Sequence, residues 1–151
     1  MPQDRLRRLD NDALYIGARH YLITICTHNR YTPFNDEAIV VTCRDQFLRA
    51  AASTRVAVVA YVFMPDHLHL LVQGTQSTSD MRKFVKTAKQ MAAFHLRGCG
   101  YRPLWQEGYH DRVVRRGEDL SNYIRYIREN PTKAGLPEER SREPFLRCPR
   151  T

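Results

Sequence analysis

The sequence predicts an α+β, ferredoxin-like domain: a four- to five-stranded, mostly antiparallel sheet with helices packed on one face and a further helix towards the C-terminus. Three observations predict this class. The hydrophobic patterns follow the order strand, helix, two strands, helix, strand, helix. The second and third strands are joined by a very short connection, which suits antiparallel neighbours. The length of 151 residues with 42% hydrophobic residues fits one globular domain with short tails.

The first half of the chain is expected to hold two strands and one helix. Residues 1–18 show no clear period and are interpreted as a basic arm. The β-branched, partly alternating run 21–27 predicts a strand. Asn35 is expected to cap a helix in which apolar residues recur at a 3.6-residue period as far as Ala50. Residues 56–63 are apolar on both faces, as in a central strand.

The next elements follow a break at residues 64–66. The run 67–72 resumes as an antiparallel neighbour of the central strand. Ser79 is expected to cap a second helix with one apolar and one basic face, and Gly98 lies beyond its end. Residues 109–114 predict a further strand.

The last predicted element is a helix from Gly117 to Glu129. Asn130-Pro131 is expected to end it, because the residue before a proline disfavours helical geometry. The elements together define one domain over residues 19–136. The remainder, 137–151, has mixed charge and is interpreted as a C-terminal tail, with disorder as an open alternative.

The charge of the chain favours a polyanionic partner. Its 24 Lys and Arg residues exceed its 16 Asp and Glu residues, which gives a formal net charge of +8. Arginine suits bidentate contacts to phosphate, so nucleic acid is the first candidate. A basic protein without such a partner is the alternative. The longest apolar run, 56–65, is far shorter than the about 20 residues of a membrane helix. We therefore expect a cytoplasmic protein without a membrane partner.

The four cysteines predict neither a disulfide framework nor a zinc site. They are widely separated and include no pair at a C-x-x-C spacing. We expect them to be ordinary core or surface residues.

A His-Leu-His sequence in the third strand suggests a metal site. Side chains alternate along a strand, so His67 and His69 point the same way, with Cα atoms roughly 7 Å apart. Two imidazoles at this spacing can converge on one cation. They are only half of a site, so a third ligand must come from elsewhere. The alternative is that one or both histidines are ordinary core or surface residues.

The final helix carries two tyrosines with different expected positions. On a helical wheel, Tyr123 shares one apolar stripe with Leu120, Ile124 and Ile127. Tyr126 and Asn130, spaced i and i+4, lie together on the flank of that stripe. Tyr123 is therefore better explained as a core residue, and Tyr126 as an edge residue able to reach a pocket. Such a tyrosine is more often a packing residue, and an asparagine before proline is often a helix stop.

Three ordered motifs make the chain similar to a known family. They are 64–71 (MPDHLHLL), 104–112 (LWQEGYHDR) and 126–136 (YIRENPTKAGL). Together they resemble the REP-associated tyrosine transposases, part of the single-tyrosine HUH transposase superfamily of bacterial insertion sequences. The resemblance extends from about Tyr21 to Leu136. The second motif includes Trp105, Gln106, His110 and Asp111, to which we assign no individual roles.

The resemblance implies a metal-dependent DNA strand transferase and endonuclease. In that family two histidines and a polar residue one turn after the tyrosine bind a divalent metal, which matches His67, His69 and Asn130. The tyrosine on the late helix is the nucleophile, which matches Tyr126. The implied reaction cuts single-stranded hairpin DNA, such as REP-like palindromes, through a 5′-phosphotyrosine intermediate during DNA transposition.

The resemblance also implies a cofactor and partners. The metal would be Mg²⁺ or Mn²⁺, and two imidazoles suit Mn²⁺ better. The partner would be single-stranded DNA hairpins, bound by a monomer or a homodimer associated with the nucleoid. The candidates for contacts to DNA phosphates are Arg82, Lys83, Lys86, Lys89, Arg112, Arg115 and Arg116. For the helical lysines and arginine among them, a merely solvated face is an equal alternative.

Two other functions remain open at this point. One is a domesticated protein that binds or regulates hairpin DNA without cutting it. The other is a metal-dependent phosphodiester hydrolase that uses His67, His69 and His110 and forms no covalent adduct with DNA.

Overall fold

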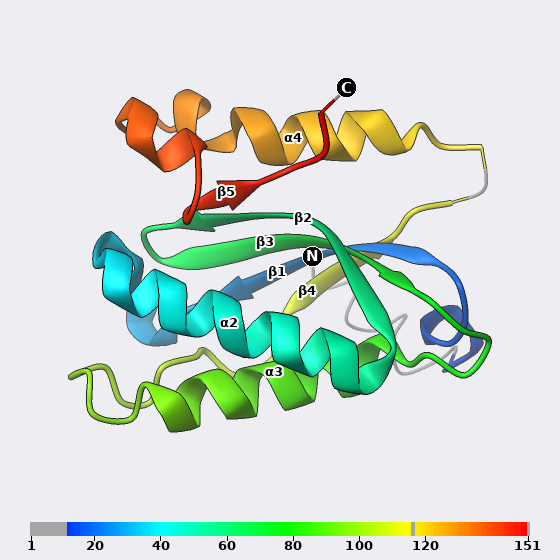
Figure 1. Ribbon diagram of the computed structural model, residues 1–151, viewed down its shortest axis with the longest axis horizontal. Helices are drawn as coiled ribbons and strands as arrows, with labels where there is room; N and C mark the ends of the chain where they lie inside the picture. Colours follow the sequence, from blue (N-terminus) through cyan, green and yellow to red (C-terminus); the bar gives the residue numbers. More distant parts are fainter. Residues whose placement is uncertain (1–11, 116, 151) are drawn as a thin grey trace.

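The computed structural model describes residues 12–115 and 117–150 of the chain. A five-stranded sheet forms a middle layer between two layers of helices (Figure 1). The strands are β1 (His20–Cys26), β2 (Val56–Met64), β3 (His67–Gly74), β4 (His110–Val113) and β5 (Leu146–Arg147). Their order is β4-β1-β3-β2-β5, and all neighbours are antiparallel. The predicted α+β, ferredoxin-like class is confirmed.

The helices cover both faces of this sheet. Figure 1 shows α2 (Glu37–Thr54) and α3 (Met81–His95) on one face and α4 (Leu120–Lys133) on the other. The short 3-10 helices are η1 (Asp12–Tyr15), η2 (His28–Arg30), η3 (Pro33–Asn35) and η4 (Glu138–Ser141). The first eleven residues of the predicted basic arm lie outside the described residues. Within the described ranges, no helix has both the length and the apolar character needed to cross a membrane.

β3 is the central strand and has a different core on each face. It pairs along its length with β1 and with β2. Leu68, Leu70 and Val72 are buried in the larger core under α2 and α3. Leu71 is buried in a smaller core on the opposite face. The alternation of side chains along an extended strand thus divides β3 between the two helical layers.

α4 supplies the smaller core with one apolar stripe. Tyr123, Ile124 and Ile127 are buried there against Val62 of β2 and Leu71 of β3. Tyr126 lies outside the stripe and is exposed. The predicted distinction between the two tyrosines of this helix is confirmed.

Both predicted helix caps are wrong by one residue. Asp36 caps α2 and Asp80 caps α3, and each carboxylate accepts the backbone N–H two residues further along at 2.9 Å. Asn35, the predicted cap of α2, belongs to η3. Ser79, the predicted cap of α3, precedes the residue with the extended backbone that a cap requires. In both places two polar residues are adjacent in sequence, and the backbone geometry decides which of them caps the helix.

α4 continues through the proline that was expected to end it. The helix reaches Lys133, with Pro131 buried inside its last turn. Proline lacks one N–H donor, and the disfavoured geometry of the preceding residue is a preference rather than a prohibition. Burial of the proline ring offsets that cost. As a result Asn130 remains helical and stays one turn from Tyr126.

The segment after α4, predicted as a C-terminal tail with disorder left open, contains defined structure as far as Arg147. It forms η4 and then β5, which pairs with β2. Arg140 of η4 is buried, and its guanidinium donates to the carbonyl oxygens of Phe34 and Phe63 at 2.7 Å each. The C-terminal segment is therefore attached to two distant parts of the domain. All four cysteines are free thiols, in line with the absence of a predicted disulfide.

Removal of the Arg140 guanidinium should destabilise the fold. Arg140→Met keeps an apolar stem but leaves two buried carbonyl groups without their donor. We expect the free energy of unfolding to fall by about 2–4 kcal/mol, measured by urea denaturation. Arg142→Met, at an exposed position in the same segment, should change it by less than about 0.5 kcal/mol. Equal stability of the two variants would contradict an anchoring role for Arg140.

Candidate active site

His67 and His69 lie at the start of β3, on the sheet face that α4 covers. Their ring centroids are 4.7 Å apart, with the ring planes at 82°. The two imidazoles therefore lie side by side, as the two-residue period of the strand predicts. The His69 side chain is buried, whereas His67 is partly exposed.

Each imidazole is held by a hydrogen bond at its Nδ1 atom. The His67 Nδ1 atom lies 2.7 Å from Asp66 Oδ1, and since a carboxylate only accepts, the imidazole donates. The His69 Nδ1 atom lies 2.8 Å from the hydroxyl oxygen of Thr24 on β1. When Nδ1 of His69 is the donor, both Nε2 atoms carry free lone pairs. Such outer hydrogen bonds orient the histidine ligands of metal sites, so this pair fits a divalent cation.

The carboxylate of Asp66 is itself held in its ionised form. Burial alone would raise the pKa of Asp66, but hydrogen bonds from Arg30 and His67 outweigh it and lower the pKa. Arg30 Nε lies 3.0 Å from Asp66 Oδ2. Asp66 therefore stays negative at neutral pH and keeps the imidazole of His67 in one orientation.

Burial keeps the imidazole of His69 neutral. Removal from water, with a further effect from His67, lowers the pKa of His69 from 6.5 to about 3. A neutral imidazole can bind a cation without first losing a proton. His69 therefore has the protonation state of a metal ligand at physiological pH.

Tyr126 of α4 lies beside this pair. Its ring centroid is 5.3 Å from that of His69, and 44% of the residue is exposed. Tyr123, one turn earlier, is buried, and its hydroxyl donates to Glu118 Oε2 at 2.7 Å. Of the two tyrosines of α4, Tyr126 is thus the one that combines an exposed side chain with contact to the histidine pair. The pair and the tyrosine meet within a single chain.

Asn130 lies one helical turn after Tyr126, and its amide Nδ2 donates to the carbonyl oxygen of Tyr126 at 3.4 Å. Its role as a metal ligand stays a prediction. Among the described residues, no three or more His, Cys, Asp or Glu side chains form a group that could hold a metal. Among the described residues, the candidate metal ligands that the structure brings together are thus the two imidazoles of His67 and His69.

A cleft of about 640 Å³ lies beside Tyr126, and we call it the Tyr126 cleft. Its lining includes Leu22 and Thr24 of β1, His110 and Arg112 of β4, and Tyr123 and Tyr126 of α4. Thr24 therefore takes part in two features, because it also holds His69. The cleft and the histidine pair are neighbouring parts of one site.

His110 lines this cleft at a distance from the histidine pair. It is the sheet partner of Thr24, which is in turn the partner of His69. His110 and His69 are therefore two strands apart, or roughly 10 Å between their Cα atoms. The register separates His110 from the proposed metal ligands.

Two other residues of the second family motif have structural contacts. Trp105 is buried, and its Nε1 donates to the carbonyl oxygen of Lys89 at 3.1 Å. The Gln106 backbone N–H donates to the carbonyl oxygen of Cys26 at 2.9 Å. This segment therefore packs beside the end of β1.

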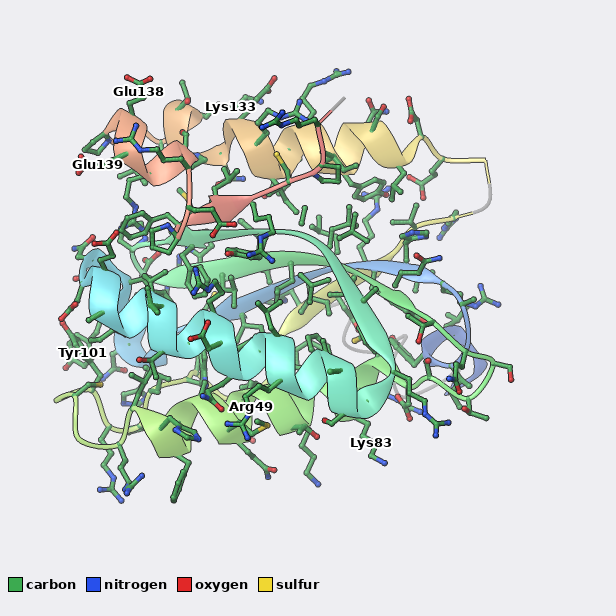
Figure 2. The ribbon with its side chains drawn as sticks, viewed as in Figure 1. Arg49, Lys83, Tyr101, Lys133, Glu138 and Glu139 are labelled. Atoms are coloured by element: carbon green, nitrogen blue, oxygen red, sulfur yellow. The ribbon has the colours of Figure 1, made fainter. Side chains whose placement is uncertain are left out.

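The predicted DNA contacts of α3 lie in the layer opposite α4. Lys83 and Lys86 are exposed, and Figure 2 shows Lys83 pointing away from α3, on the far side of the molecule from Lys133. Arg82 Nε lies 3.4 Å from Asp80. Lys89 Nζ donates to two loop carbonyl oxygens at 3.1 and 2.8 Å, so it holds a loop.

The remaining basic candidates lie in β4 or directly after it. Arg112 is exposed, lines the Tyr126 cleft and lies 3.4 Å from Glu118. Arg115 is exposed, and its backbone N–H donates to Glu118 at 2.8 Å. Arg116 lies outside the described residues. Of the predicted DNA contacts that are described, Arg112 is the one that lines the cleft beside Tyr126.

Sequence reasoning missed the side chains that hold the histidines. Asp66 is adjacent to His67 in sequence, so its contact with that imidazole could have been predicted. Thr24 is far away in sequence, and only the register between β1 and β3 places it beside His69.

The chain is similar in sequence to known proteins. A family model described as "Transposase IS200 like" matches residues 16–130. A REP-associated tyrosine transposase of Escherichia coli (strain K12) is 26% identical over 86 residues, or 57% of this chain and 50% of that protein. A Haemophilus influenzae protein, provisionally given the same name, is 31% identical over 91 residues, or 53% of this chain and 52% of that protein. The chain thus spans about half the length of these curated relatives.

A solved structure supports the fold. It is that of a REP-associated tyrosine transposase bound to a REP hairpin, and it superposes with a TM-score of 0.73 at 21% identity. The match covers 87% of this chain and 78% of that one. At this identity the likeness shows the shared fold.

The low pKa of His69 predicts a loss of stability in mild acid. Its value is about 3 in the folded chain, against 6.5 as its ordinary value. Between those values the unfolded chain binds a proton at His69 that the folded chain does not. The free energy of unfolding should therefore fall as the pH falls from about 6.5 to 4.5, by about 2 kcal/mol from this group.

Urea denaturation of the wild type and of His69→Asn, with EDTA present, measures this contribution. Other titrating groups act equally in both proteins, so the difference between the two pH profiles isolates His69. The variant should lose about 2 kcal/mol less over this range. Parallel profiles would show that the imidazole titrates in the folded chain as it does in the unfolded one.

Proposed function

The chain belongs to the IS200-like transposase family, and on that premise we propose that it is a metal-dependent endonuclease and strand transferase for single-stranded DNA. The observation that carries this proposal is the position of Tyr126, 5.3 Å from the buried His69 between ring centroids and exposed to a substrate. A phenol beside two imidazoles on a basic domain suits cleavage of an anionic phosphodiester. The substrate we propose is hairpin DNA of the REP type, because a similar fold is found bound to such a hairpin.

Tyr126 is the proposed nucleophile. Its oxygen attacks the scissile phosphorus, the bond from phosphorus to the 3′ oxygen breaks, and that oxygen takes up a proton. The products are a 5′-phosphotyrosine and a free 3′-OH. The phosphotyrosine keeps the energy of the broken bond, so a different 3′-OH can attack it and rejoin the strand. A phenol is a weak nucleophile until its proton is removed, which requires a nearby base or cation.

His67 and His69 are the proposed holders of a divalent cation, Mg²⁺ or Mn²⁺, with Asn130 as a further ligand. The hydrogen bonds at both Nδ1 atoms support this proposal, since they leave the Nε2 atoms available. When bound, such a cation polarises the scissile phosphate and offsets its negative charge. Two nitrogen donors suit Mn²⁺ better than the oxygen-preferring Mg²⁺.

The surrounding residues have positioning roles. Asp66 and Thr24 orient the two imidazoles, and Arg30 keeps the carboxylate of Asp66 in place. The net charge of +8 favours binding of the DNA backbone, to which Arg112 beside the site would contribute. The site forms within one chain, so both a monomer and a homodimer are compatible with it. Action on chromosomal DNA would place the protein in the cytoplasm, at the nucleoid.

Two alternative functions make different predictions. A domesticated DNA-binding protein would share the fold but form no covalent adduct. A hydrolase that uses His67, His69 and His110 is less well supported, because β1 separates His110 from the other two. A hydrolase would also turn over repeatedly without becoming attached to DNA.

The two tyrosines of α4 provide the test of the nucleophile. Wild-type protein with Mn²⁺ and a 3′-labelled single-stranded hairpin should form a labelled protein–DNA adduct that resists SDS. Tyr126→Phe should bind the hairpin but form less than about a thousandth of the adduct, because the attacking oxygen is absent. Tyr123→Phe should still form the adduct, since the hydroxyl of Tyr123 donates a hydrogen bond to Glu118 and is not the attacking group. Adduct formation by Tyr126→Phe would disprove the assignment, and its absence from the wild type would favour the two alternatives.

Thr24 tests whether the histidine pair binds metal. Thr24→Val keeps the shape of the side chain but removes the oxygen bonded to His69 Nδ1. We expect the affinity for Mn²⁺, titrated by electron paramagnetic resonance, to fall about 10- to 100-fold. Thr87→Val, a partly buried position on α3, is the matched control and should bind as the wild type does. Unchanged binding by Thr24→Val would argue against His69 as a ligand.

A further inference from the structure

The Tyr126 cleft lies beside the proposed nucleophile and is large enough for part of a substrate. Its volume of about 640 Å³ lies in the usual range of ligand pockets. Tyr126 lines it directly. If the oxygen of Tyr126 attacks a phosphorus, the group that fills the cleft must belong to a nucleotide joined to that phosphate. The cleft is thus placed to receive one part of a nucleotide that flanks the cut.

The charges in the cleft suit a base rather than a phosphate. The carboxylates of Asp111, Glu118 and Asp119 line it, against the single guanidinium of Arg112. A backbone N–H from Arg115, followed by the hydroxyl of Tyr123, lowers the pKa of Glu118, so this carboxylate is ionised at neutral pH. Carboxylates repel a phosphate but accept hydrogen bonds from the amino groups of bases. Leu22 and the Tyr123 ring supply apolar surface for the base plane.

Asn122 is a side chain in this lining whose amide is available for hydrogen bonds. Glu118 and Asp119 already accept bonds from Tyr123 and from the backbone of Ser121. Asn122 is exposed, and within the described part of the chain its amide makes no hydrogen bond. It lies one helical turn before Tyr126, so their Cβ atoms are about 6 Å apart on one face of α4. An amide that both donates and accepts can read a base edge.

We propose that the Tyr126 cleft receives the base of a nucleotide flanking the scissile phosphate, and that Asn122 selects this base by hydrogen bonds. The inference rests on the proposed function, since it needs Tyr126 to attack that phosphate. The carboxamide matches an edge with one donor beside one acceptor, for which N6 and N7 of adenine are the standard partner. The target sequence is then read in part by protein side chains at the point of cleavage.

A panel of labelled hairpins tests this proposal. One set of four hairpins varies the base before the cut, and a second set of four varies the base after it. The rate of adduct formation is measured for all eight with Mn²⁺. The wild type should prefer adenine at one of the two positions by about tenfold, the effect of one good bidentate contact. Asn122→Ala should reduce this preference to less than about threefold, while adduct still forms on every substrate.

Two further variants separate base recognition from a structural effect. Asn122→Asp offers two acceptors and no donor, so its preference should move from adenine to a base with amino and imino donors, such as guanine. Ser121→Ala removes a neighbouring hydroxyl on α4 and should keep the wild-type preference. A change in which base is preferred cannot result from a general loss of structure.

The outcomes distinguish this proposal from the proposed function. If the wild type forms adduct equally well on all eight substrates, base recognition is contradicted but the proposed function is not. The same holds if Asn122→Ala or Asn122→Asp keeps the full wild-type preference. A wild type that forms no adduct with any hairpin contradicts the proposed function, and this inference falls with it.

Discussion

The alternation of side chains along β3 is the constraint on which the rest of the structure depends. Leu68, Leu70 and Val72 face the core under α2 and α3, which leaves His67 and His69 on the face of α4. A shift of one residue in the register would turn the imidazoles into the larger core and three apolar side chains out of it. The same burial that stabilises the sheet therefore fixes the position of the candidate metal ligands.

α4 completes the site by a similar division between packing and chemistry. Its apolar stripe is buried on the sheet, and this attachment holds Tyr126 over His69 from the edge of the helix. Continuation of the helix through Pro131 keeps Asn130 on the same side as Tyr126. The C-terminal segment supports this layer, because Leu146 of β5 packs in the core that α4 covers. Rigid packing thus positions the proposed nucleophile, whose own side chain stays accessible.

Prediction from the sequence succeeded where the signal was a short period and failed where it was a long-range contact. Short periods and apolar runs located four of the five strands and the three α-helices that the structure describes, and the different environments of Tyr123 and Tyr126. The contacts of the C-terminal segment could not be predicted, because the partners of Arg140, the carbonyl groups of Phe34 and Phe63, are 106 and 77 residues away. The helix caps were missed by one residue because adjacent polar side chains differ only in backbone geometry.

Local patterns were enough to predict the fold class, from the order of the elements, and the shared face of His67 and His69 and the outward position of Tyr126, from the periodicity of single elements. Only the tertiary structure decided that Thr24 holds His69, that burial keeps His69 neutral, and that Asn122 and Tyr126 line one cleft. Each of these features depends on contacts between different elements, since the cleft itself forms between β1, β4 and α4. Their distances depend on strand register and helix docking, which come from the packing of the whole chain and leave no local pattern in the sequence.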